Sequence, residues 1–194
     1  KLQKQDPGNE HGVPYLWGTN GIGYNVEKVR AVLGDAAPVG SLDLIFKPQY
    51  MQRLASCGVA FVDAPREVFP VVLHYLGLDP NTKDVEVYRH QARDLLMGVR
   101  PYIRYFSSSQ YINDLASGEI CVAYGYSGDM FQARARAAEA RNGVKIGYSI
   151  PSEGTMMWFD LLAIPAGARH LANAHKFIDF LLRPEVIAGV THHV

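Results

Sequence analysis

Carboxylate, hydroxyl and aromatic side chains follow or lie within the segments of this sequence that we interpret as β-strands. The residues concerned are Asp63, Glu67, Ser107, Ser108, Ser109, Tyr126, Asp129, Trp158, Phe159 and Asp160. Because ligands of open α/β sheets bind outside the carboxyl ends of the strands, we expect these side chains to gather at one edge of a sheet.

The charges of this set indicate the kind of ligand. None of the residues is Arg or Lys, whereas a phosphate or carboxylate ligand would need those residues or bare helix N-termini. Carboxylates beside aromatic rings suit an ammonium group instead, through charge-assisted hydrogen bonds and cation–π contact. Several separated carboxylates suit a ligand with several ammonium groups, so the sequence predicts a site for a small amine.

Each of these residues also has a purely structural interpretation. Asp129 opens a predicted helix and Glu67 lies in a first helical turn, where acidic side chains are favoured in any case. Ser108 precedes a helix and could cap it, and Trp158 could belong to the core. Asp160 is harder to explain in this way, because a carboxylate between Trp-Phe and Leu-Leu in a strand would be buried at a cost unless something pairs with it.

The segment Gly125-Tyr126-Ser127-Gly128-Asp129 lies between a predicted strand and a predicted helix, as the nucleophile elbow of a serine hydrolase would. Asp129 occupies the position of the second glycine of that motif, so a serine hydrolase is only an alternative hypothesis. The sequence contains no G-x-G-x-x-G fingerprint and no Cys/His cluster. We therefore expect a binding function rather than an enzyme, with no catalytic residues, no metal and no cofactor.

Strand-like and helix-like segments alternate through most of the chain. Predicted strands cover residues 21–26, 58–62, 102–106, 120–126, 144–150 and 156–164, and predicted helices cover residues 27–33, 67–76, 85–98, 111–116 and 129–141. Apolar residues at helical spacing from Leu171 to Leu182 predict a further helix, and residues 34–48 have the composition of a long loop. The alternation implies βαβ units and a mostly parallel sheet covered on both faces, which is an α/β fold.

The 194 residues carry no net charge, since 19 Lys and Arg residues balance 19 Asp and Glu residues. A nucleic-acid-binding face normally leaves a basic excess, so we expect no nucleic-acid partner. No apolar run approaches the roughly 18 residues that a membrane-spanning helix needs. The first residue is Lys1 rather than Met, and we expect the chain to be an excerpt of a longer protein.

Cys57 and Cys121 lie far apart in the sequence and belong to no metal-binding motif. They could be two buried thiols, or they could form a structural disulfide in an oxidising compartment. The residues alone leave both possibilities open.

Four long blocks of the sequence carry a family resemblance. They are GTNGIGYN (18–25), CGVAFVDAPREVF (57–69), RYFSSSQYINDLASGEICVAYGYSGD (104–129) and SEGTMMWFDLLAIP (152–165). Together they resemble the bacterial periplasmic polyamine-binding proteins, and the putrescine-binding type looks closest. The resemblance implies a fold like that of type II periplasmic binding proteins, with a doubly wound, mostly parallel sheet and crossover strands between two lobes.

The same resemblance implies a function and partners. It indicates a monomeric periplasmic receptor that captures putrescine or spermidine by lobe closure and delivers it to the membrane permease of an ABC importer. A receptor of the same fold for another cationic or amino compound is the alternative.

Matched block by block, the resemblance also implies which residues contact the ligand. They are Glu67, Ser108, Tyr126, Asp129, Trp158 and Asp160. Tyr126 stands where the family motif has Trp, which weakens the cation–π attraction and adds a hydroxyl group.

Two structural expectations follow from the resemblance as well. Cys57 and Cys121 should form a disulfide. Residues 1–16 and 159–194 should belong to the first lobe, residues 17–158 should form the second lobe, and the rest of the first lobe should lie outside this sequence.

Overall fold

The computed structural model describes residues 6–193, with side chains described for residues 6–191. The chain divides into two compact units. The first unit combines Lys1–Gly18 with Met157–Val194, and the second unit is the continuous stretch Thr19–Met156. Residues 1–5 of the segment expected at the start of the first lobe lie outside the described residues.

The second unit is built on a sheet whose strands lie in the order β3-β2-β4-β1-β5. The strands are β1 (Val13–Asn25), β2 (Val59–Phe61), β3 (Tyr105–Phe106), β4 (Val122–Tyr126) and β5 (Ile146–Ser149). β2 is parallel to β3 and β4, whereas β1 is antiparallel to β4 and β5. Four of these five strands therefore share one direction, which confirms the predicted α/β class and the mostly parallel sheet.

β1 is the strand that runs against its neighbours, and it is longer than the sequence pattern predicted. The predicted strand begins at residue 21, but β1 begins at Val13 in the first unit and enters the second unit at Thr19. The connection from β4 through a helix to β5 is a crossover that places β5 parallel to β4, on the far side of β1.

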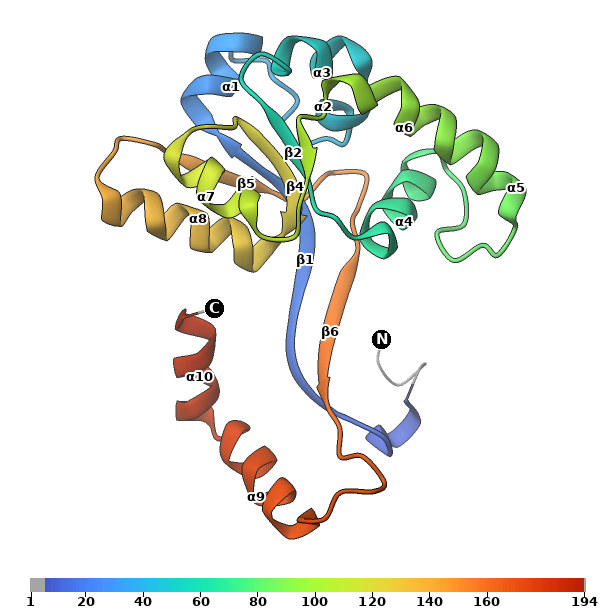
Figure 1. Ribbon diagram of the computed structural model, residues 1–194, viewed down its shortest axis with the longest axis vertical. Helices are drawn as coiled ribbons and strands as arrows, with labels where there is room; N and C mark the ends of the chain where they lie inside the picture. The colour runs from blue at the N-terminus through green and yellow to red at the C-terminus, as the bar shows by residue number, and fades with distance from the viewer. Residues whose placement is uncertain (1–5, 194) are drawn as a thin grey trace. The chain divides into compact units, whose positions relative to one another are not determined.

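Helices cover both faces of this sheet (Figure 1). They are α1 (Val26–Leu33), α2 (Asp43–Phe46), α3 (Pro48–Leu54), α4 (Pro65–Tyr75), α5 (Val85–Val87), η3 (Tyr88–Ala92), α6 (Arg93–Val99), η4 (Arg100–Tyr102), α7 (Gln110–Ser117) and α8 (Ser127–Ala140). In Figure 1, α7 and α8 lie on one side of the strands, and α4 and α6 lie on the other. β2 has no exposed residue, as expected for a strand covered on both faces.

The expectation of a long loop at residues 34–48 is wrong in its second half. α2 begins at Asp43 and buries Leu44, Ile45 and Phe46. Four residues are too few to show a helical period in the sequence, so packing against neighbouring helices stabilises this turn.

Local signals in the sequence begin and end the longer helices. Asn25 Oδ1 accepts a hydrogen bond from the backbone N–H of Lys28 at 3.0 Å and caps α1. Ser107 Oγ accepts one from the backbone N–H of Gln110 at 3.0 Å at the start of α7. Gly118 ends α7 with a φ of 82°, a left-handed conformation that glycine adopts without strain.

Cys57 and Cys121 form a disulfide, with their Cα atoms 5.5 Å apart. Cys57 lies just before β2 and Cys121 just before β4, and Val59 pairs with Val122 in the parallel ladder between these strands. The disulfide therefore joins the amino ends of two neighbouring central strands. The pairing implied by the family resemblance is confirmed.

The first unit contains η2 (Pro7–Asn9), the start of β1, β6 (Met157–Leu162), α9 (Leu171–Leu181) and α10 (Pro184–His193), and β6 pairs with β1. The helix predicted after residue 171 is confirmed as α9. None of the described hydrophobic side chains of this unit is buried, and Phe177 is 60% exposed. The described residues therefore leave much of the apolar surface of α9 exposed.

Candidate functional site

The edge of the sheet at the carboxyl ends of β2, β3 and β4 gathers four of the six expected ligand residues. Glu67 lies in the first turn of α4, and Asp129 lies in the first turn of α8. Ser108 lies between β3 and α7, and Tyr126 is the last residue of β4. The parallel strands thus bring together residues that are far apart in the sequence, as open α/β sheets do.

Glu67 is half-buried, and its carboxylate accepts a hydrogen bond from a residue that was not among the ligand residues expected from the sequence. The side chain of Asn20 is fully buried, and its Nδ2 donates a hydrogen bond to Glu67 Oε2 at 2.8 Å. Asn20 belongs to β1 and pairs with Tyr126 across the sheet. Because β1 runs antiparallel, it enters the sheet at the edge where the other strands end.

Asp129 is also half-buried and also held by a neutral donor. The hydroxyl group of Tyr111, a fully buried residue of α7, donates a hydrogen bond to Asp129 Oδ2. Burial raises the pKa of Asp129, while the bond from Tyr111 and the charge of Arg136 act in the opposite direction. Burial and the neighbouring Asp129 likewise raise the pKa of Tyr111.

Gly125 of β4 makes the approach of Tyr111 to Asp129 possible. A Cβ atom at position 125 would lie 2.6 Å from the hydroxyl oxygen of Tyr111, which is too close for any side chain. The glycine therefore serves close packing at the site rather than a nucleophile elbow.

Tyr126 lies within the electrostatic reach of both carboxylates. Burial raises its pKa, and the negative charges of Glu67 and Asp129 raise the pKa of Tyr126 further. The site therefore presents an aromatic ring together with two carboxylates whose described hydrogen-bond donors, Asn20 and Tyr111, are both uncharged.

Ser108 is exposed and does not cap α7. Ser107 Oγ accepts the backbone hydrogen bonds there, from Ser109 at 3.3 Å and from Gln110 at 3.0 Å. Ser108 Oγ instead donates to the carbonyl oxygen of Asp63 at 3.3 Å. The purely structural interpretation of Ser108 as a helix cap is therefore wrong.

Trp158 and Asp160 belong to β6 in the first unit. They lie two positions apart in a strand and so share one face of it, whereas Phe159 faces the other way. Asp160 is exposed, which contradicts the expectation of a buried carboxylate. The neighbouring apolar residues Leu161 and Met157 are themselves 43% and 41% exposed, so they do not remove Asp160 from water.

Ser127 shows no sign of activation as a nucleophile. Its Oγ accepts a hydrogen bond from the backbone N–H of Thr19 at 3.3 Å, and no described hydrogen bond joins it to a histidine. No group of three potential metal ligands occurs among residues 6–191. No helix in the described part of the chain is long and apolar enough to cross a membrane.

Comparison with known proteins relates this geometry to a family. A family model for bacterial extracellular solute-binding proteins matches residues 4–191. The putrescine-binding periplasmic protein PotF of Escherichia coli is 56% identical over 193 residues, which are 100% of this chain and 52% of that protein. The putrescine-binding periplasmic protein SpuD of Pseudomonas aeruginosa is 52% identical over 190 residues, which are 98% of this chain and 52% of that protein.

A solved structure is similar as well. The crystal structure of the TpPotD lipoprotein of Treponema pallidum matches with a TM-score of 0.73 and 31% sequence identity, over 95% of this chain and 53% of that chain. The chain spans about half the length of the curated relatives it matches.

Proposed function

Since this chain belongs to the family of bacterial extracellular solute-binding proteins, we propose that the whole receptor captures a polyamine by closure of its two lobes. Putrescine and spermidine are the expected ligands, because the relatives with high identity are named as putrescine-binding proteins and others as spermidine/putrescine-binding proteins. The receptor delivers its ligand to the membrane permease of an ABC importer and acts as a monomer in the periplasm, without nucleic acid.

The proposal is supported by the burial and the hydrogen-bond partners of two carboxylates. Glu67 and Asp129 are both half-buried, both act on the pKa of Tyr126, and neither accepts a described hydrogen bond from Lys or Arg. The charge of Arg136 acts on Asp129 from a distance, but no described hydrogen bond or ion pair joins Lys or Arg to either carboxylate, so an ammonium group would compensate their charge at close range. Two such carboxylates suit a ligand with more than one ammonium group.

The six residues have distinct proposed roles. Glu67 and Asp129 each bind an ammonium group, the ring of Tyr126 contributes cation–π contact, and Ser108 contributes a hydroxyl oxygen. Trp158 and Asp160, from the first unit, add a second aromatic ring and a third carboxylate in the whole receptor. A binding protein needs no catalytic group, and the named relatives are binding proteins, which supports a receptor rather than a hydrolase.

Calorimetric titration of the whole receptor tests the proposal with three compounds that share a four-carbon chain. Putrescine carries two ammonium groups, 1-aminobutane carries one, and 1,4-butanediol carries none. We expect putrescine to bind more tightly than 1-aminobutane by about 30-fold or more, which corresponds to about 2 kcal/mol for one buried charge pair. We expect no detectable binding of the diol.

Two results would contradict the proposal. Equal affinity for putrescine and 1-aminobutane would show that the second carboxylate does not bind the ligand. Absence of putrescine and spermidine binding, together with binding of another amino compound, would favour the receptor of different specificity.

A further inference from the structure

Asn20 is a fully buried polar residue at the candidate site, with 0% of its surface exposed. Its backbone N–H donates to the carbonyl oxygen of Met156 at 3.1 Å, and its carbonyl oxygen accepts from Thr155 Oγ1 at 2.7 Å. Its side-chain Nδ2 donates to Glu67 Oε2 at 2.8 Å. Asn20 thus connects the carboxylate of Glu67 to the segment of chain that ends the second unit.

Packing alone does not explain why an asparagine occupies this buried position. Its Oδ1 is buried and has no hydrogen-bond partner among the described residues, and such an orphaned acceptor costs stability. Rotation of the amide by half a turn would not solve this, because it would point Oδ1 at the carboxylate of Glu67. The described hydrogen bond of the Asn20 amide is the one to Glu67, and the amide also acts on the hydroxyl group of Tyr124.

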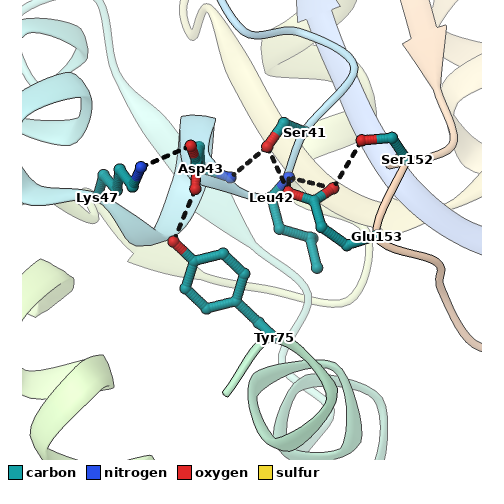
Figure 2. A network of polar contacts seen from close by, with 7 residues as sticks. All are labelled: Ser41, Leu42, Asp43, Lys47, Tyr75, Ser152 and Glu153. Atoms are coloured by element: carbon teal, nitrogen blue, oxygen red, sulfur yellow. Dashed lines mark hydrogen bonds and ion pairs between the residues drawn. The ribbon is translucent and has the colours of Figure 1, made fainter. Parts of the chain in front are cut away.

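The segment 152–156, which contains the backbone partners of Asn20, is joined to the start of α2 by hydrogen bonds of Glu153 (Figure 2). The carboxylate of Glu153 accepts hydrogen bonds from Ser41 Oγ, from the backbone N–H of Leu42 at 3.1 and 3.2 Å, and from Ser152 Oγ at 3.2 Å. Burial acts to raise the pKa of Glu153, but these hydrogen bonds outweigh it and lower the pKa, so the carboxylate stays ionised at neutral pH. Thr155 follows two residues later and is therefore held in place against Asn20.

We propose that Asn20 is a positioning residue that orients the carboxylate of Glu67 for the ligand. Its amide binds Oε2, and Oε1 has no partner among the described hydrogen bonds and is left for an ammonium group. The proposal rests on the proposed function, since it assumes that Glu67 binds a cationic ligand. It adds a residue of β1 to the site, and it links that carboxylate through Thr155 to the anchored segment around Glu153.

A double-mutant cycle in the whole receptor tests the proposal, with putrescine affinity measured by calorimetry. We expect Asn20→Ala to weaken putrescine binding by about tenfold or more in the wild-type background. In the Glu67→Ala background, where there is no carboxylate to orient, we expect Asn20→Ala to change affinity by less than about threefold.

Asn25 provides a matched control, because it is a second buried asparagine on the same strand and lies at the far end of β1, where it pairs with Ile146 of β5. Asn25→Ala removes the cap of α1 and should lower the melting temperature without ligand, while putrescine affinity changes by less than about twofold. This control separates loss of stability from loss of orientation.

Asn20→Asp covers the case in which Asn20→Ala does not fold, because aspartate has nearly the same shape. It places a second carboxylate against Glu67, and the two groups should then share a proton. We expect putrescine binding to release a proton in this variant and not in the wild type, measured by calorimetry in buffers with different ionisation enthalpies.

The outcomes distinguish this inference from the proposed function. A wild-type receptor that does not bind putrescine overturns both. A wild-type receptor that binds, with equal effects of Asn20→Ala in both backgrounds or with no added proton release in Asn20→Asp, overturns only the role of Asn20.

Discussion

At the scale of single residues, the candidate site combines carboxyl groups with uncharged hydrogen-bond donors. The amide of Asn20 holds Glu67, and the phenol of Tyr111 holds Asp129. Neutral donors orient a carboxylate without cancelling its charge, whereas Arg or Lys would do both. The arrangement therefore keeps two negative charges oriented and available for a cation.

Asp129→Asn should weaken putrescine binding strongly in the whole receptor. The two side chains are nearly the same shape and both accept a hydrogen bond from Tyr111, so the change removes mainly the charge. Loss of one partner of a buried charge pair costs about 2–5 kcal/mol, which is on the order of 30- to several thousand-fold in affinity. Calorimetric titration measures the change.

Asp114 offers the control for this variant, because it too accepts a hydrogen bond from a tyrosine, Tyr105, at 2.6 Å. Asp114→Asn should leave putrescine affinity within about threefold of the wild type. Equal effects of the two substitutions would argue against a ligand role for Asp129.

The same Asp129→Asn substitution should stabilise the receptor in the absence of ligand. Burial raises the pKa of Asp129, so the folded state disfavours the ionised form, and this loss of stability develops as the pH rises above 3.8. We expect the variant to have the higher melting temperature at pH 7 and the difference to vanish below about pH 4.

Melting curves with and without saturating putrescine check this prediction. Ligand should reverse the order at pH 7, because the wild type gains more from binding. A variant that melts lower than the wild type without ligand at pH 7 would mean that the charge of Asp129 is compensated by the protein itself.

At the scale of elements, the second unit places its disulfide and the candidate ligand site at opposite ends of its strands. The disulfide between Cys57 and Cys121 joins the amino ends of β2 and β4, whereas Tyr126 and the residues after β2 lie at the carboxyl ends. The disulfide and the candidate site therefore lie at opposite ends of the same strands.

Replacement of both Cys57 and Cys121 by alanine should lower stability much more than affinity. The bond spans 64 residues of sequence, and closing a loop of that length contributes about 4 kcal/mol in the chain-entropy view. Urea unfolding of the whole receptor should show this loss, while putrescine affinity at low temperature stays within about threefold. Detection of two free thiols in the denatured, unreduced wild type would rule out the disulfide.

At the scale of the whole molecule, the two units differ in how completely their apolar side chains are covered. The second unit has a continuous buried core, which includes Phe61, Tyr111 and Tyr124. In the first unit, Leu171, Phe177 and Phe180 of α9 are 54%, 60% and 47% exposed. Exposed apolar side chains in such number are typical of a surface that another part of a protein covers.

The 194-residue chain by itself should therefore bind putrescine more weakly than the whole receptor, by about a hundredfold or more. It spans about half the length of its relatives, so it lacks whatever ligand contacts the remaining half supplies. Calorimetry on a chain of verified mass measures the affinity, and binding of a hydrophobic dye compares the exposed apolar surface of the two forms. Equal affinity of the chain and the whole receptor would show that this half holds the complete site.

The sequence alone determined the class of fold, and it indicated the kind of ligand that we propose. Apolar runs at residues 58–62 and 120–126 indicated buried strands, and the polar residues after them, such as Glu67 and Asp129, indicated an edge with negative charge. These features are local, because a run of a few residues determines whether a strand is covered on both faces and which residue follows it. The pairing of Cys57 with Cys121 did not follow from the residues and came only from the family resemblance.

Only the tertiary structure decided which residues hold the carboxylates. Asn20 reaches Glu67 because β1 runs antiparallel and enters the sheet at the edge where β4 ends, and strand direction leaves no mark on the local pattern. Tyr111 reaches Asp129 because Gly125 leaves room for its hydroxyl group, and Glu153 anchors Leu42 across 111 residues of sequence. Periodicity in a sequence reports which face of an element is apolar, whereas hydrogen bonds between distant elements depend on how those elements pack.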